Sequence, residues 1–306
     1  MAMLDRILLT GASGFVGRAL LEDLSAEGRH IVCLGRSAPK LPGVKLAAAD
    51  IADPCSLRAA LATLRKTSHF DAIIHLAVSR HHRDFPQRAL DLLYVNTVST
   101  AELLDFARDT GVRHAVFGST GSVYSAKSSV SHGSVHGNHE SEFRKPADYF
   151  VASKLFSDTF CDFYRSDLNI ATLRMYVPYG PGLKDRMLSD LVQRVESGRP
   201  LSLPASGPGL AFASLYIDDA KAVIRAALMN GWNETVNVAG PGVLTIESAG
   251  RLIGRILGRD PKYERGRHSF APRIVPDTGR LAELMPSHAF TAPEAGLRAM
   301  IAARKT

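Results

Sequence analysis

A glycine-rich segment near the start of the chain has the spacing needed to hold a phosphate group. Residues 10–17 read TGASGFVG, with glycines at positions 11, 14 and 17. The first glycine permits a tight turn, the second lets the backbone approach a pyrophosphate, and the third lets a helix pack closely on the preceding strand. A helix that starts here offers unpaired N–H donors and the positive end of its dipole. The residues expected to contact the pyrophosphate of a dinucleotide are Gly11, Ser13, Gly14, Phe15, Val16 and Gly17.

The elements that must position this turn alternate between strand and helix. A short apolar run at 6–10 ends at the first glycine, and residues 15–27 carry apolar side chains at helical spacing. The same alternation predicts strands at 30–34, 44–48, 72–76, 114–117 and 170–174, and helices at 56–65, 89–110 and 149–166. Strands separated by helices favour right-handed crossovers and a parallel sheet covered on both faces. The expected fold class is α/β, a Rossmann doubly wound parallel sheet with a smaller mixed C-terminal substrate region.

Glycine and proline become frequent after Tyr179, which marks a second region of the chain. We expect residues 1–176 to form an NAD(P)-binding Rossmann domain and residues 177–306 mainly to bind the substrate, with 210–240 returning to the Rossmann core. A second region of this kind would close over the carboxyl edge of the sheet, where such folds bind ligands. Residues 125–145 are rich in Ser, Gly and His, which predicts an exposed loop next to the active site.

Composition excludes several classes of protein. The 306 residues are 45% hydrophobic, so the chain can bury a large core, and no apolar run reaches about 18 residues, the length of a membrane span. A secretion signal is also missing from the first residues, which predicts a cytoplasmic protein. The net charge of +7 is spread along the chain, which favours a small anionic ligand over nucleic acid.

Cysteine and histidine show no metal-ligand spacing. The three cysteines are scattered, which argues against a disulfide framework or a zinc site. His132, His136 and His139 cluster in the Ser- and Gly-rich stretch, where a solvated loop is favoured over a metal tract because no carboxylate or cysteine accompanies them at ligand spacing. We therefore expect no metal.

The glycine turn resembles the TGxxGxxG signature of the extended short-chain dehydrogenase/reductase family, the group of NAD(P)-dependent sugar epimerases, dehydratases and reductases. Further segments resemble the family's motifs in the expected order and cover nearly the whole chain; they are DI at 50–51, HLA at 75–77, NTVST at 96–100, STGSVY at 119–124, YGP at 179–181, YIDD at 216–219 and DTGR at 277–280. The resemblance implies further cofactor contacts at Asp50, Ile51, Leu76, Ala77, Val78, Asn96, Lys154 and Tyr176.

The end of the second strand bears on the choice between NAD and NADP. An acidic residue there would bind the ribose 2′-hydroxyl of NAD, but the strand ends in Leu34-Gly35-Arg36-Ser37. The missing carboxylate and the available Arg36, with Ser37 beside it, suit a 2′-phosphate and favour NADP. If Arg36 instead stacks on the adenine or faces solvent, NAD is equally acceptable.

The resemblance implies three catalytic side chains near the nicotinamide: a Tyr acid/base, a Lys four residues later that lowers its pKa and holds the ribose, and a Ser or Thr hydroxyl. Thr120 matches the hydroxyl position and Lys154 the lysine. Phe150 stands where the tyrosine is expected, and Tyr149 lies one residue too early, about 100° around a helix.

Several interpretations of this gap stay open. A distorted helix start could bring Tyr149 into place, or Phe150 could be an engineered substitution or the natural residue of an enzyme with another acid/base. The chain could also bind the cofactor without turning it over, as a regulatory protein would.

A nucleotide-linked sugar is the substrate class that the resemblance implies. Arg267 resembles a diphosphate clamp, and Ser119, Thr120, Tyr124 and Val177 lie at substrate-contacting positions. Dehydration is disfavoured because Gly121 and Ser122 stand where the family's dehydratases carry Asp and Glu. Epimerisation is the leading reaction, reduction of a keto sugar by NADPH comes second, and a homodimer through helices 89–110 and 149–166 is implied.

Overall fold

The computed structural model describes residues 4–81, 84–124, 137–142, 146–267 and 273–304. These residues divide into two compact units. The first unit comprises Met1–Val123, Arg144–Arg174 and Lys221–Val236, and the second comprises Tyr124–Phe143, Met175–Ala220 and Asn237–Thr306.

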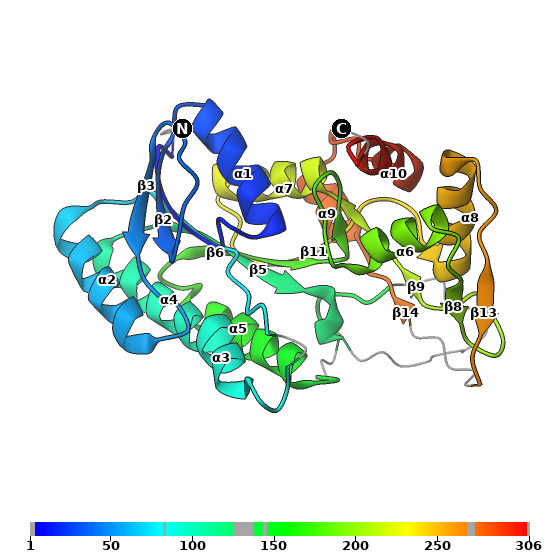
Figure 1. Cartoon of the computed structure of the whole chain (residues 1–306). Coiled ribbons are helices and arrows are strands. Elements are labelled where there is room, and N and C mark those ends of the chain that lie inside the picture. Colours follow the sequence, from blue (N-terminus) through cyan, green and yellow to red (C-terminus); the bar gives the residue numbers. More distant parts are fainter. Residues whose placement is uncertain (1–3, 82–83, 125–136, 143–145, 268–272, 305–306) are drawn as a thin grey trace. The chain divides into compact units, whose positions relative to one another are not determined.

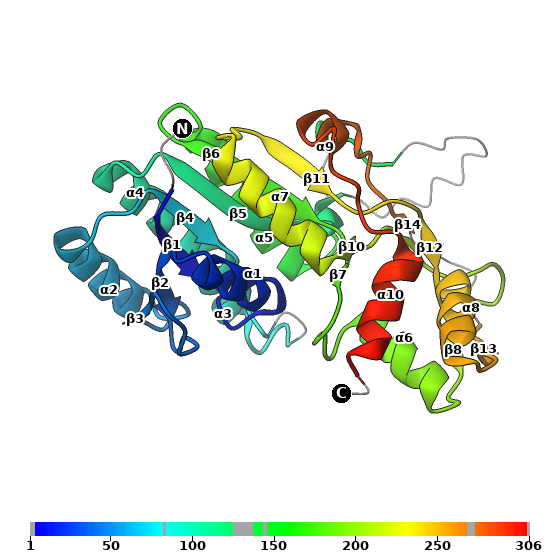
Figure 2. The ribbon, with the colours of Figure 1, turned by 90° about the horizontal axis from the view of Figure 1, so that it is seen from above.

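The central sheet has seven parallel strands, as the alternation of strands and helices predicts (Figure 1). Their order is β11-β6-β5-β4-β1-β2-β3 (Figure 2). Its strands in chain order are β1 (Arg6–Thr10), β2 (His30–Gly35), β3 (Val44–Ala48), β4 (Ala72–His75), β5 (His114–Thr120), β6 (Asn169–Met175) and β11 (Thr235–Val238). Residues of β1 pair in register with both β2 and β4, so the glycine turn leaves the sheet at its centre. The expected α/β Rossmann fold is confirmed.

Helices cover both faces of this sheet. Figure 1 shows α2 (Pro54–Thr67), α4 (Ser99–Thr110) and α5 (Tyr149–Tyr164) on one face. The other face carries α1 (Phe15–Ala26) and α7 (Ile217–Met229), which lie side by side in Figure 2. An ion pair of 3.0 Å between Lys221 and Asp23 joins these two helices. The sheet is therefore buried between two helical layers, as a parallel sheet requires.

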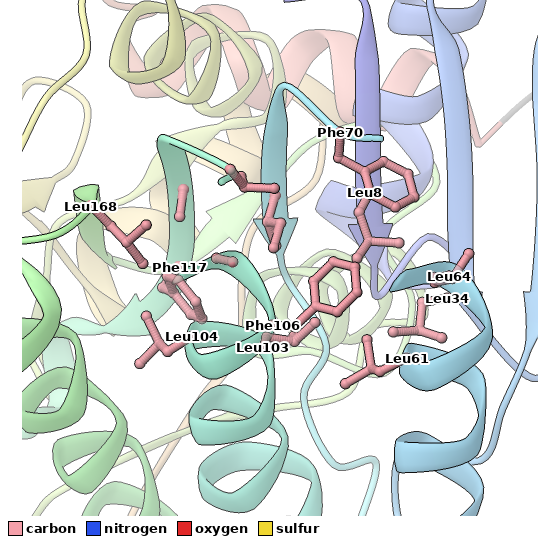
Figure 3. Packing of buried hydrophobic residues seen from close by; sticks show 14 of the residues in the cluster. Leu8, Leu34, Leu61, Leu64, Phe70, Leu103, Leu104, Phe106, Phe117 and Leu168 are labelled. Atoms are coloured by element: carbon pink, nitrogen blue, oxygen red, sulfur yellow. The ribbon is translucent and has the colours of Figure 1, made fainter. Parts of the chain in front are cut away.

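A cluster of buried apolar side chains lies between the sheet and the α2/α4/α5 layer. Leu8 and Phe117 point from the strands toward Leu61, Phe106 and their neighbours on the helices (Figure 3). The buried side chains of α2 and α4 meet there. The ring of Phe70, which follows α2, lies against that of Phe106 on α4, with centroids 6.2 Å apart. This packing fixes the helical layer that includes α5, on which Phe150 and Lys154 lie.

The helix expected at 89–110 forms three consecutive segments. They are α3 (Ala89–Leu93), a π-helical turn η1 (Tyr94–Val98) and α4. The Asn96 carbonyl in the π turn accepts hydrogen bonds from the hydroxyls of Thr100 and of Ser157, the latter on α5. A hydroxyl from a neighbouring helix that bonds a helical carbonyl is one way in which a regular helix is locally widened.

The second unit is mixed in structure. Its helices are α6 (Met187–Glu196), α8 (Ile246–Leu257), α9 (Gly279–Leu284) and α10 (Pro293–Ala302), and Figure 2 shows α6, α8 and α10 close together. Its strands form three small sheets: β7 (Pro178–Tyr179) with β10 (Leu215–Tyr216); β9 (Ala211–Phe212) with β12 (Leu244–Thr245) and β14 (Arg273–Ile274); and β8 (Leu201–Leu203) with β13 (Tyr263–Arg265).

Within the described ranges, none of the helices combines the length and apolar character that crossing a membrane requires. The same residues contain no group of three or more His, Cys, Asp or Glu side chains that could hold a metal ion. Of the histidine cluster, His132 and His136 lie outside the described residues. His139 lies within them, and its Nδ1 is 2.9 Å from the Ser141 hydroxyl.

Candidate active site

The glycine turn between β1 and α1 can accept only glycine at two of its positions. Gly11 has a φ of +75°, and a Cβ there would overlap the backbone of Leu76, the residue that follows the neighbouring strand β4. A Cβ on Gly17 would overlap the carbonyl of Gly11, so α1 packs directly against the turn. The roles that spacing alone predicts for these glycines therefore have a steric basis.

The start of α1 fits an anionic group. Gly14 caps the helix without a side-chain hydrogen bond, and no acidic residue occupies the first turn, which begins at Phe15 and Val16. Ser13 and Gly14 are exposed. Uncapped N–H groups at a helix start bind phosphate well, so the residues present fit a dinucleotide diphosphate.

A buried histidine ties this turn to the neighbouring elements. The His75 Nδ1 atom lies 2.6 Å from the Thr10 hydroxyl, and its Nε2 atom lies 3.2 Å from the Ser99 hydroxyl. Ser99 donates its own proton to the Val95 carbonyl, so Nε2 must carry the proton of the ring and Nδ1 must accept from Thr10. Burial, with a smaller effect of Lys154, lowers the pKa of His75 to about 3. A neutral, singly oriented imidazole therefore links β1, β4 and α4.

Other predicted cofactor contacts lie along the carboxyl ends of β2, β3 and β4. Arg36 and Ser37 are exposed after β2, and Arg36 makes no ion pair among the described residues. The Asp50 carboxylate accepts a hydrogen bond from the backbone of Ala52, and Ile51 beside it is half-buried. After β4, Leu76 is half-buried, Ala77 is buried and Val78 is 43% exposed.

The helix α5 carries Lys154 and Phe150, which stand at the positions expected to be catalytic. It starts regularly at Tyr149, because the Asp148 side chain accepts a hydrogen bond of 2.8 Å from the backbone of Val151. Lys154 is 5% exposed and makes no hydrogen bond or ion pair in the part of the chain that the structure describes. Burial lowers the pKa of its ammonium, and Asp158 opposes this shift.

Tyr149 is held away from the place that a catalytic tyrosine would take on this helix. Its ring stacks on Phe85, with centroids 5.0 Å apart and planes inclined by 25°. Phe150 is half-buried, and its carbonyl accepts a hydrogen bond from the Ser153 hydroxyl. In this structure the regular helix start leaves Phe150, and not Tyr149, one turn before Lys154.

Two hydroxyls end strand β5 where it meets α5. The Thr120 hydroxyl accepts a hydrogen bond of 3.2 Å from the backbone of Ser122, which leaves its proton for another acceptor. The Ser119 hydroxyl is buried and has no hydrogen-bond partner among the described residues. Tyr124 is different, because its hydroxyl donates to the Asn237 side chain at 2.8 Å. The phenol of Tyr124 is thus engaged inside the second unit.

Asn96 links the π turn to α5. Its side chain is fully buried, accepts from the backbone of Ser79 at 3.1 Å and donates to the Ser153 hydroxyl at 2.8 Å. Since Ser153 in turn donates to Phe150, the amide helps to fix the first turn of α5. Asn96, predicted as a cofactor contact, is bonded to protein at both ends of its amide.

The remaining predicted site residues belong to the second unit. Tyr176 is 1% exposed, and Val177 follows it with a φ of +38°, which is unusual for a β-branched residue. Arg267 is exposed and makes no ion pair within the described ranges.

Two features of the site escaped the sequence analysis. One is the hydroxyl and imidazole chain through His75, and the other is an ion pair between Asp158 of α5 and Arg174 of β6. Arg174, a charged residue near the end of the otherwise apolar strand 169–175, was the available signal for the second. The first had none, since its partners are more than 20 residues apart in the chain.

Comparison with known proteins identifies relatives of this chain. It is 25% identical over 301 residues to dTDP-4-dehydro-6-deoxy-D-allose reductase from Streptomyces bikiniensis, an alignment that covers 91% of this chain and 90% of the relative. It is also 25% identical over 278 residues to UDP-glucuronate 4-epimerase from Thermodesulfobacterium geofontis, covering 84% of this chain and 82% of the relative. Both relatives are named for reactions on nucleotide-linked sugars.

Solved structures share the fold. A tyrosine-to-phenylalanine mutant of UDP-glucuronic acid 4-epimerase from Bacillus cereus, solved with UDP-4-deoxy-4-fluoro-glucuronic acid and NAD, superposes with a TM-score of 0.81 at 22% identity, covering 98% of this chain and 99% of that one. The sequence pattern of the NAD dependent epimerase/dehydratase family matches residues 7–239, more than three quarters of the chain. The chain therefore belongs to the NAD dependent epimerase/dehydratase family.

Proposed function

We propose that this protein binds NAD or NADP together with a nucleotide-linked sugar and moves a hydride between the cofactor and a carbinol or carbonyl carbon of that sugar. The observation that carries the proposal is the glycine turn, which presents uncapped N–H groups at α1 while Lys154 and Thr120 lie on elements of the same unit. Residues 1–176 would serve the cofactor and residues 177–306 mainly the substrate.

Each retained side chain has a role in this reaction. A bound nicotinamide supplies the hydride donor or acceptor. The Lys154 ammonium would bind the nicotinamide ribose, and the Thr120 hydroxyl would donate a hydrogen bond to the sugar oxygen whose charge grows as hydride leaves or arrives. The Phe150 ring cannot exchange the proton that accompanies hydride transfer, so water or another side chain must exchange it.

Relatives support the substrate class. The curated relatives above act, by their names, on dTDP- and UDP-linked sugars. Ser119, Tyr124, Val177 and Arg267 are our proposed substrate contacts. The orphaned hydroxyl of Ser119 supports this assignment, because a buried hydroxyl without a partner is stabilised when a ligand supplies one.

NADP is the proposed cofactor, with NAD as its competitor. The exposed Arg36 after β2 has no carboxylate partner among the described residues, so its guanidinium is available to a 2′-phosphate. The solved epimerase structure described above contains NAD, so both cofactors should be tested.

A cytoplasmic homodimer is the proposed form of the protein. All three cysteines are free, which suits a reducing compartment. On α5, Phe156 and Phe163 are 57% and 75% exposed, and two large apolar side chains on one helix are suited to an interface.

The test is to titrate the protein with NADH and NADPH by fluorescence and then to assay UDP- and dTDP-linked hexoses and their 4-keto forms. We expect saturable binding of at least one reduced cofactor, and hydride transfer with at least one sugar. No binding of either cofactor would overturn the proposal.

Epimerisation and reduction separate in the same experiment. An epimerase should purify with cofactor bound and need no added reductant, whereas a reductase consumes NADPH stoichiometrically with product. The reductase is favoured by Arg36 and by the relative from Streptomyces bikiniensis. Cofactor binding without turnover of any sugar would instead indicate a regulatory protein, which Phe150 favours and the retained Lys154 and Thr120 oppose.

A further inference from the structure

An ion pair buried inside the first unit has no role in the proposed chemistry as described so far. The Nε atom of Arg174 on β6 lies 3.0 Å from Oδ2 of Asp158 on α5, and both side chains are 1% exposed. Removing two charges from water costs about as much as their attraction returns, so such a pair is a weak source of stability. A functional reason for keeping it is therefore worth seeking.

Asp158 occupies the same face of α5 as the catalytic positions. It lies four residues after Lys154 and eight after Phe150, and residues spaced by four stack on one side of a helix. Arg174 fixes Asp158 through Oδ2, while Oδ1 has no hydrogen-bond partner among the described residues. The carboxylate is thus immobilised with one oxygen uncommitted.

Lys154 needs a negative neighbour because it is 95% buried and a buried ammonium tends to lose its proton. The groups that act on it are few. His75 on β4 is neutral because burial lowers its pKa. The Cys161 thiol on α5 is neutral because burial raises its pKa to about 12. The Arg174 guanidinium forms its ion pair with Asp158. Asp158 is the anion in this set and raises the pKa of Lys154 against the effect of burial.

We propose that Asp158, oriented by Arg174, is a positioning residue that keeps the buried Lys154 side chain protonated. The proposal rests on the proposed function only in that a charged Lys154 is what binds the cofactor ribose. A tyrosine at position 150 could supply a phenolate to attract the Lys154 ammonium, but phenylalanine cannot. Asp158 supplies the negative charge instead.

The experiment is the pH profile of Lys154 acylation by trace acetic anhydride, followed by peptide mass spectrometry, because only the neutral amine reacts. In Asp158→Asn the midpoint should fall by at least about one pH unit, so that at a given pH below the midpoint roughly tenfold more amine reacts. Asp158→Glu keeps the charge and should restore most of the profile. Asp162→Asn, at an exposed position of the same helix, is the matched control and should not move it.

Two outcomes would overturn the proposal: an unchanged midpoint in Asp158→Asn, or an equal shift in Asp158→Glu. If Asp158→Asn fails to fold because Arg174 loses its carboxylate partner, the double variant Asp158→Asn with Arg174→Gln removes both charges and is subject to the same criterion.

Cofactor binding separates this inference from the proposed function. At a pH above both midpoints, Asp158→Asn should bind the reduced cofactor about tenfold more weakly than the unmodified protein. If the unmodified protein binds no cofactor, the proposed function fails while the acylation profile still decides the role of Asp158. If cofactor binds and the profile does not move, the positioning role fails alone.

Discussion

At the scale of single residues, the aromatic ring at position 150 is the main departure from the chemistry that the family motifs imply. The regular start of α5 and the stacking of Tyr149 on Phe85 leave no phenol at the position one turn before Lys154. Lys154 and Thr120 are retained, so the proposed site has two of the three side chains that the family motifs imply and lacks the proton-exchanging one.

Phe150→Tyr should therefore raise the rate of hydride transfer by about a hundredfold or more, the usual contribution of a general acid/base. Turnover numbers on an accepted sugar measure this. Phe156→Tyr adds the same hydroxyl to an exposed position of the same helix and should give no gain. Equal rates for Phe150→Tyr and the unmodified protein would show that position 150 is not a disabled catalytic position.

Val177 is the second residue where the backbone and the side chain disagree. Its φ of +38° places a β-branched residue in the left-handed region, which costs roughly 1–2 kcal/mol. Val177→Asn should raise the free energy of unfolding by about 1 kcal/mol, because Asn tolerates this region. Urea denaturation measures it, with Val243→Asn at an exposed valine as control. A loss of stability would mean that packing of the valine methyl groups outweighs the backbone strain.

At the scale of elements, the contact between the glycine turn and α1 determines whether the helix can present its N–H groups. Gly17→Ala places a methyl group against the Gly11 carbonyl and must push the helix away. We expect at least a tenfold loss of cofactor affinity in a fluorescence titration, about 1.4 kcal/mol. Gly266→Ala, where a Cβ meets only ordinary van der Waals contact, should bind normally. Undiminished binding by Gly17→Ala would contradict the proposed placement of the pyrophosphate.

The imidazole that joins β1, β4 and α4 makes stability depend on pH. In the folded state the pKa of His75 is about 3, compared with 6.5 for an unperturbed histidine. Between these values the unfolded chain binds a proton that the folded chain does not, so His75 lowers the free energy of unfolding as pH falls below 6.5 and has no such effect above it.

His75→Gln should reduce the slope of the free energy of unfolding against pH by up to about 1.4 kcal/mol per pH unit, the value for one bound proton. Urea unfolding at pH values of about 7.5 and 5 measures the slope. His30→Gln, which removes an exposed imidazole, is the matched control. An unchanged slope in His75→Gln would mean that the ring is already protonated in the folded protein.

At the scale of the whole molecule, the exposed apolar face of α5 bears on assembly. The proposed homodimer would cover Phe156 and Phe163. The double variant Phe156→Glu and Phe163→Glu should then have half the solution mass of the unmodified protein, because burying a carboxylate in an apolar interface is costly.

Light scattering after size exclusion measures this mass. Met229→Glu changes an exposed methionine on α7 and should leave the mass unaltered. A monomeric unmodified protein would contradict the proposed dimer.

Local spacing in the sequence was enough to predict the order of strands and helices as far as β6, the glycine turn, and the phenylalanine one turn before Lys154, because each depends on neighbours within a few helical turns. Tertiary structure decided what surrounds them. The Thr10–His75 contact joins residues 65 apart, Asn96 and Ser153 are 57 apart, and Asp158 meets Arg174 across a strand–helix interface. Partners so distant in the chain are brought together only when the sheet forms and the helices pack on it. No local pattern could therefore have revealed that Lys154 is buried with a neutral imidazole, or that Arg174 fixes the carboxylate one turn along α5.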